Sequence, residues 1–306
     1  MAAPGFASSN SSSRRPSVFS LIFWLVVMLF LWSFNYVAGK IALRHLDPIT
    51  LACFRLELAA ILMLAIYFAR RNRSPVRARH IWAYIYLGFF GVVLNQGLFT
   101  VGLNYTTSDH SAVIIAVGPI IILLLARAMK LEALTSAKVI GMLLSFAGVL
   151  LLEAEQGSPL HSPFLFGDVI TFGGTVGFAV YTVLGKKIAE EYDAVSMNTF
   201  IGVAAALLLL PLSIRQGIHL DWSSVGWVGW SGMAYMAIGS SIIAYTIFYW
   251  ALRYMTASRV GAISYFQPPV VILLAVAFLG EHPTGNLLAG TALVLLGVYL
   301  AERGTA

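Results

Sequence analysis

Two ionisable residues, Arg55 and Glu57, lie inside an otherwise apolar stretch of the sequence, residues 49 to 69. If a helix begins at Pro48, a rise of about 1.5 Å per residue places them roughly 10 Å and 13 Å along it. An ionisable side chain at that depth in hydrocarbon is costly, so it normally faces a partner or a watery cavity. Because Arg55 and Glu57 are two positions apart, they point to different helix faces and cannot simply neutralise each other.

Each of the two charges has a structural and a chemical interpretation. Arg55 is either a tether to backbone carbonyls and polar neighbours, or a cation that pairs with an anionic group of a bound molecule. Glu57 is either a structurally paired or protonated acid, or a proton carrier, because burial in a span makes proton exchange by a carboxyl group chemically feasible. It is the only acidic residue that we expect deep within a span.

Other polar and aromatic side chains add hydrogen-bonding groups to the same apolar environment. Those that we expect to contact a bound molecule are Trp32, Asn35, Asn95, Tyr245, Tyr265 and Gln267. Helix packing is the alternative for the amides, but a cavity with aromatic walls and a few amides suits small amphipathic metabolites. Lys40 ends its apolar stretch, where it either reaches the headgroups or attracts a carboxylate or phosphate at the cavity rim.

Prolines interrupt two further apolar stretches, at Pro119 and Pro268. Proline removes a backbone hydrogen bond and kinks a helix. In a membrane the freed carbonyl groups are tolerated where they face protein or water. Each break is therefore either a static kink or a hinge beside the bound molecule.

The segments that position these residues belong to an internal sequence repeat, in which one unit occurs twice. A shift of 149 residues brings Pro119 onto Pro268 and Gly148 onto Gly297, and we expect these glycines to serve close helix packing. The unit carries five apolar segments, an odd number, so the second copy must enter a bilayer upside down. Inverted repeats are typical of secondary transporters, with the substrate site where the halves meet.

The composition independently indicates a membrane protein. Hydrophobic residues make up 59% of the chain and charged residues 10%, against roughly 25% charged in soluble domains. The ten apolar segments cover residues 18–40, 49–69, 81–103, 109–128, 136–152, 167–186, 195–214, 226–251, 257–279 and 284–301. We therefore expect an all-α integral membrane protein with ten transmembrane helices in two inverted five-helix repeats, residues 18–152 and 167–303, joined by a linker at 153–166. The Ser-rich residues 1–17 are predicted to be a disordered tail.

The distribution of lysine and arginine predicts the orientation. If the N-terminus is cytoplasmic, fifteen of these residues fall on the cytoplasmic side, and only Lys40, Arg44 and Arg215 fall on the other side. Positive charges stay cytoplasmic during insertion, so both termini are predicted to be cytoplasmic. The net charge of +6 is then a topology signal, and the sequence indicates no nucleic-acid partner.

Short motifs in the two halves resemble those of a known family. They are residues 32–36 (WSFNY) with Lys40, Asp47-Pro48 and Arg55, followed by Gly239-Ser240-Ser241, Ala244-Tyr245, Gln267-Pro268 and Leu279-Gly280-Glu281. In this order they resemble the EamA-like family of the drug/metabolite transporter superfamily over nearly the whole chain. The resemblance implies ten helices around a central cavity, but it does not name the cargo. Glu57 departs from the pattern, in which that position is usually apolar.

These observations predict a secondary active transporter in a bacterial inner membrane. We expect it to export small metabolites such as amino acids by alternating access, with proton coupling as one hypothesis. A passive facilitator or channel, and a drug or nucleotide-sugar carrier of the same fold, remain alternatives. The six histidines show no metal-ligand spacing, and the sequence has no nucleophile elbow or phosphate loop. We therefore expect no enzymatic activity, cofactor or metal, and the sequence leaves monomer and homodimer both open.

Overall fold

The computed structural model describes residues 16–130, 135–153, 163–255 and 257–303. The predicted tail, residues 1–17, and the predicted linker, residues 153–166, fall mostly outside these ranges. Over the described residues the chain crosses the bundle ten times, and every crossing is helical. The prediction of an all-α fold with ten helices is confirmed.

The first repeat provides the first five crossings. They are α1 (Val18–Leu43), α2 (Pro48–Ala69), a third crossing made of η1 (Ala78–His80), α3 (Ile81–Gly88), η2 (Phe89–Gly97) and α4 (Leu98–Tyr105), a fourth made of α5 (Ser108–Ile115) and α6 (Gly118–Ala128), and α7 (Ser136–Glu153). The second repeat follows the same plan. Its crossings are α8 (Leu165–Ala189), α9 (Ala194–His219), a crossing made of α10 (Gly226–Tyr235), η5 (Met236–Ala244) and α11 (Tyr245–Tyr254), another made of α12 (Ala257–Gly261), η6 (Ala262–Phe266) and α13 (Gln267–Leu279), and α14 (Gly285–Arg303).

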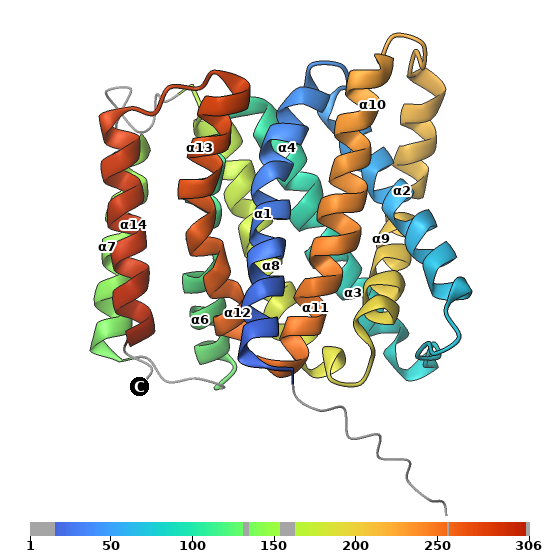
Figure 1. Cartoon of the computed structure of the whole chain (residues 1–306), viewed down its shortest axis with the longest axis horizontal. Coiled ribbons are helices and arrows are strands. Elements are labelled where there is room, and N and C mark those ends of the chain that lie inside the picture. The colour runs from blue at the N-terminus through green and yellow to red at the C-terminus, as the bar shows by residue number, and fades with distance from the viewer. Residues whose placement is uncertain (1–15, 131–134, 154–162, 256, 304–306) are drawn as a thin grey trace, which may run out of the picture.

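Eight crossings in the described part of the chain are long and apolar enough to span a membrane. The other two, α7 and α14, have shorter apolar stretches, Ser136–Gly148 and Gly285–Gly297. These two helices pack against each other at one edge of the bundle (Figure 1). A Cβ atom added at Gly148 would lie 2.6 Å from the carbonyl oxygen of Gly290, so the predicted close packing by glycine is confirmed.

The two repeats run in opposite directions through the bundle. In Figure 1, α1 begins and α14 ends at the lower edge, whereas α8 begins at the upper edge. We call the lower edge the terminal face and the upper edge the opposite face. The same capping residue begins the second helix of each half. Asp47 accepts hydrogen bonds from the backbone of Ile49 and Thr50 before α2, and Asp193 accepts one from the backbone of Ser196 before α9.

Four crossings are interrupted near the middle of the bundle. The segments η2 and η5 are π-helical and occupy equivalent places in the two repeats. Pro119 lies in the first turn of α6 and Pro268 in the first turn of α13, so each proline follows the break and starts the second half of its crossing. π-Helical segments frequently mark functional sites, and broken helices at mid-membrane are typical of transporter binding sites.

Candidate functional site

The interrupted helices surround a central cavity of about 70 Å³ together with α1, α2 and α8. The cavity takes residues from both repeats. Its lining consists of Trp32, Asn35, Tyr36, Arg55, Asn95, Gln96, Phe99, Ile115, Phe178, Ser240, Tyr245, Ser264 and Gln267. Six of the residues that the sequence singled out therefore lie around one space: Trp32, Asn35, Arg55, Asn95, Tyr245 and Gln267.

Arg55 is the only charged side chain among the residues that line this cavity. It is 1% exposed, and its Nη2 atom donates to the backbone carbonyl of Gln96 at 2.9 Å and to the Gln96 side-chain oxygen at 3.4 Å. Its Nε and Nη1 atoms have no hydrogen-bond partner among the described residues. A buried charge without a counter-ion is costly, so the guanidinium group has the capacity to bind an anion.

Amide side chains of η2 connect the cavity to the second repeat. The Tyr245 hydroxyl donates to Asn95 Oδ1 at 2.7 Å, and Asn95 Nδ2 donates to the carbonyl of Gly174 on α8 at 3.0 Å. Gln96 Oε1 accepts from the Ser241 hydroxyl at 2.6 Å. These bonds fix both amides across the interface between the halves, so a movement of one half relative to the other must change the cavity.

Aromatic rings form the apolar part of the wall. Trp32 contacts Tyr245 edge-on, with ring centroids 5.4 Å apart, and Phe178 with centroids 6.0 Å apart. On the other side, the Tyr36 hydroxyl donates to Gln267 Oε1 at 3.3 Å. A cavity with aromatic walls, a cation and several amides can hold a small molecule that has an apolar body and an anionic end.

Three of the residues predicted to bind a molecule or carry charge, Tyr265, Glu57 and Lys40, lie away from the cavity. Tyr265 packs in an apolar cluster with Val113 and Ala116, and its neighbour Ser264 lines the cavity instead. Glu57 is half-buried between α2 and α9, where its carboxylate accepts a hydrogen bond of 2.8 Å from Ser213.

Lys40 lies nearer the opposite face. Its Nζ atom donates to the backbone carbonyl of Thr106 at 2.5 Å, and the side chain borders a separate hollow of about 310 Å³. The lysine thus closes α1 onto the end of α4.

An equivalent lysine contact closes the other end of the bundle. Lys186 Nζ donates to the backbone carbonyl of Leu252 at 2.5 Å, and both contacts span 66 positions along the chain. Because the repeats are inverted, Lys40 ties α1 to α4 at the opposite face, and Lys186 ties α8 to α11 at the terminal face. The cavity lies between two matched closures.

Sequence reasoning missed a buried polar cluster beside the Lys40 closure. Thr106 donates to Asp168 Oδ1 at 2.6 Å, and His110 Nδ1 lies 3.2 Å from Asp168 Oδ2. Asp168 is 3% exposed. Nearby, burial and the Asp109 carboxylate raise the pKa of Glu281 above its usual range. One signal in the sequence could have indicated this cluster. Asp168 and His110 each lie in the first turn of a predicted apolar segment, and these two segments begin on the same side of the bundle.

The site and fold together define a class of protein. A multi-pass helical membrane protein with two inverted repeats, broken helices at mid-depth and one polar cavity between the halves has the architecture of a membrane transporter. The EamA-like transporter family model matches this chain twice, over residues 19–153 and 165–302. The protein therefore belongs to the EamA-like transporter family, which is a family of transporters and not of enzymes.

Individual relatives agree with this assignment. The chain is 28% identical over 282 residues to an uncharacterized transporter of Archaeoglobus fulgidus, with 90% of this chain and 95% of that protein covered. It is 29% identical over 268 residues to the uncharacterized transporter YyaM of Bacillus subtilis, covering 86% and 87%. A crystal structure of a protein with 22% identity superimposes with a TM-score of 0.67 over 95% of this chain and 100% of that chain, which shows the shared fold.

Proposed function

We propose that this protein is a secondary active transporter that exports small carboxylate-bearing metabolites, such as amino acids, through the central cavity. The observation that carries the proposal is the unpaired guanidinium of Arg55 in a cavity whose described lining includes no acidic residue. A carboxylate would satisfy the free Nε and Nη1 donors in a paired geometry. Trp32, Asn35, Asn95, Tyr245 and Gln267 supply the apolar wall and the hydrogen bonds that orient the rest of the cargo.

The size of the cavity supports a small cargo. Its volume is about 70 Å³, whereas pockets for drug-sized ligands have about 300–1,000 Å³. A nucleotide sugar or a drug would need a much larger opening between the halves than an amino acid would. The carrier of larger molecules is therefore the less favoured alternative.

The proposed transport cycle uses the matched closures at the two ends. Release of Lys40 from Thr106 would open the opposite face, and release of Lys186 from Leu252 would open the terminal face. Once released, Lys40 would be free to attract the anionic cargo at the rim. Pro119 and Pro268, each at the start of a half-helix, would provide equivalent hinges. Tyr265, one position from the cavity residue Ser264, would join the lining when the η6 segment moves.

Energy coupling is proposed to involve Glu57. Its carboxylate lies at the contact of α2 and α9 with one hydroxyl partner, Ser213, so protonation would change how the second helices of the two repeats are held together. We place the protein in a bacterial inner membrane, as the family resemblance implies. The terminal face is proposed to lie in the cytoplasm, because most lysine and arginine residues outside the spans fall on that side.

The proposal is tested in two steps. The medium of cells with and without the protein is first compared for all metabolites, and the compound that accumulates with the protein is then used in counterflow with reconstituted vesicles. A carrier shows uptake of labelled compound stimulated by the same unlabelled compound on the other side. A passive channel would show no such stimulation, and enhanced uptake into cells with an unchanged medium would overturn the direction of transport.

A further inference from the structure

A third hollow, larger than the central cavity and the hollow beside Lys40, lies on the flank of the bundle. This groove of about 530 Å³ is formed by α1, α2, the start of α9, η5 and α11, and it shares no residue with the cavity lining. We call it the α2–α11 groove. It extends along α11 to the terminal face, where α2 and α11 both end.

The walls of the α2–α11 groove are apolar over most of its length. Ile66, Ile243 and Ile247 lie along it, and Trp24 and Trp250 border it. Trp24 is 42% exposed, Ile66 40% and Ile243 41%. In a membrane these side chains face hydrocarbon, so a lipid acyl chain is the group best suited to occupy the groove.

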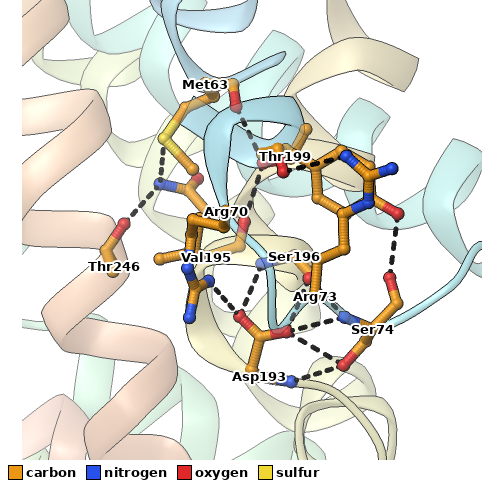
Figure 2. Close-up of polar contacts among 11 residues, drawn as sticks. Met63, Arg70, Arg73, Ser74, Asp193, Val195, Ser196, Thr199 and Thr246 are labelled. Atoms are coloured by element: carbon orange, nitrogen blue, oxygen red, sulfur yellow. Dashed lines mark hydrogen bonds and ion pairs between the residues drawn. The ribbon is translucent and has the colours of Figure 1, made fainter. Parts of the chain in front are cut away.

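The end of the groove at the terminal face is positively charged. Arg70 follows the last residue of α2, and Arg253 lies in the last turn of α11. Figure 2 shows that Asp193 already has several partners: Arg70 at 2.6 Å, the Ser74 hydroxyl at 2.9 Å and the Ser196 hydroxyl at 2.5 Å. Burial alone would raise the pKa of the Asp193 carboxyl, but the hydrogen bonds from Ser196, Arg70 and Ser74 hold it well below its usual range.

Arg253 therefore supplies the uncompensated charge of the groove. Among the described residues it has no acidic partner within ion-pair distance. Arg70 and Asp193 cancel each other in charge, although the Arg70 side chain remains 37% exposed and its guanidinium keeps further donors available. An apolar groove that is bordered by two tryptophans and ends in one net positive charge matches a lipid with an anionic headgroup.

We propose that the α2–α11 groove binds one anionic phospholipid. Its phosphate would contact Arg253 and Arg70, and one acyl chain would follow Ile66, Ile243 and Ile247. A zwitterionic lipid presents the same phosphate together with a cation of its own, so it would gain less from the net charge of the groove. This site is independent of the cargo that occupies the central cavity.

Native mass spectrometry of the purified full-length protein tests the proposal. The protein in mild detergent is incubated with dioleoyl phosphatidylglycerol or dioleoyl phosphatidylcholine, and the lipid-bound fraction is measured. The wild-type protein should retain one phosphatidylglycerol in preference to phosphatidylcholine. Arg253→Gln should reduce that retention about fivefold, because a basic residue near the headgroups contributes about 1 kcal/mol to anionic lipid binding.

Two further variants separate a specific site from general charge. Arg127 is exposed in the last turn of α6, at the same face but outside the groove, so Arg127→Gln removes the same charge and should leave retention unchanged. Ile243→Trp fills the groove and should reduce retention without altering any charge. Equal loss in the Arg127 and Arg253 variants, or equal binding of both lipids, would overturn the proposal. A stable dimer that retains no lipid would also overturn it, since a second copy would then cover the groove.

Discussion

Replacing Arg55 by glutamine distinguishes its two interpretations, a structural tether and an anion-binding group. Among the described residues, the guanidinium donates only to Gln96, at 2.9 and 3.4 Å. Losing these bonds costs about 1–3 kcal/mol, but removing a buried, unpaired charge recovers about several kcal/mol. We therefore expect Arg55→Gln to melt at or above the wild-type temperature.

The effect on an anionic cargo should be large and opposite in direction. Removing one partner of a buried charge pair costs about 2–5 kcal/mol, which corresponds to a loss of affinity of about 30-fold or more. Counterflow of the cargo in reconstituted vesicles measures this loss. A neutral amide analogue provides the control: the wild-type protein should discriminate strongly against it, and the Arg55→Gln variant should not.

The conservative variant Arg55→Lys adds a check on geometry. Lysine keeps the charge but lacks the paired donors of the guanidinium, so partial recovery of carboxylate transport is expected. If Arg55→Gln transported the carboxylate at the wild-type rate and melted at a lower temperature, Arg55 would be a tether and the reasoning about the cargo would be wrong.

Three further predictions follow from other parts of the molecule. Glu57→Gln should fold and still exchange substrate but lose accumulation driven by a pH gradient; gradient-driven transport at the wild-type rate would place coupling elsewhere. Asp193→Asn should lower the melting temperature at pH 7 by about 3 °C, from about 2 kcal/mol of lost charge-assisted hydrogen bonds. Because the pKa of Asp193 is lowered, the wild-type advantage should be complete above about pH 4 and fade as the pH falls through the lowered value; equal melting at pH 7 would contradict this account. A reporter fused after Ala306 should be cytoplasmic, and one inserted between residues 157 and 163 should lie on the other side; finding both on one side would exclude the proposed orientation.

The helices were predictable because hydrocarbon imposes a simple rule on length and polarity. Ten apolar stretches and a repeat shift were enough to predict the crossings and their inverted order. The same rule identified Arg55 and Asn95, since a polar side chain deep in a span needs a partner or a cavity. The rule could not identify which residue is the partner of each polar side chain, because the partners are distant in the sequence. Ser213, the hydroxyl partner of Glu57, lies 156 positions away in the sequence.

Local helix geometry explains the remaining differences. An ideal α-helix would place Ser241, Tyr245 and Tyr249 on one face, every four residues. The π-helical η5 segment widens the turn, so Ser240 and Tyr245 line the cavity although they are five residues apart. Tyr249 lies one turn further along α11, where its hydroxyl contacts the Tyr181 hydroxyl. The 3₁₀ turn at η6 likewise directs Ser264 into the cavity. Composition and periodicity do not reveal such changes of helix type.

The two repeats share the residues that cap and close their helices, but they do not share the charged residue of the cavity. Asp47 and Asp193, as well as Lys40 and Lys186, are repeat equivalents at a shift of 146 residues. At the same shift, Arg55 corresponds to Ile201, which is fully buried in the apolar core. The halves thus share their caps and closures, but only one carries the cavity charge. In an alternating-access mechanism a single charge has to serve both open states, and it can do so only from the space between the halves, where Arg55 lies.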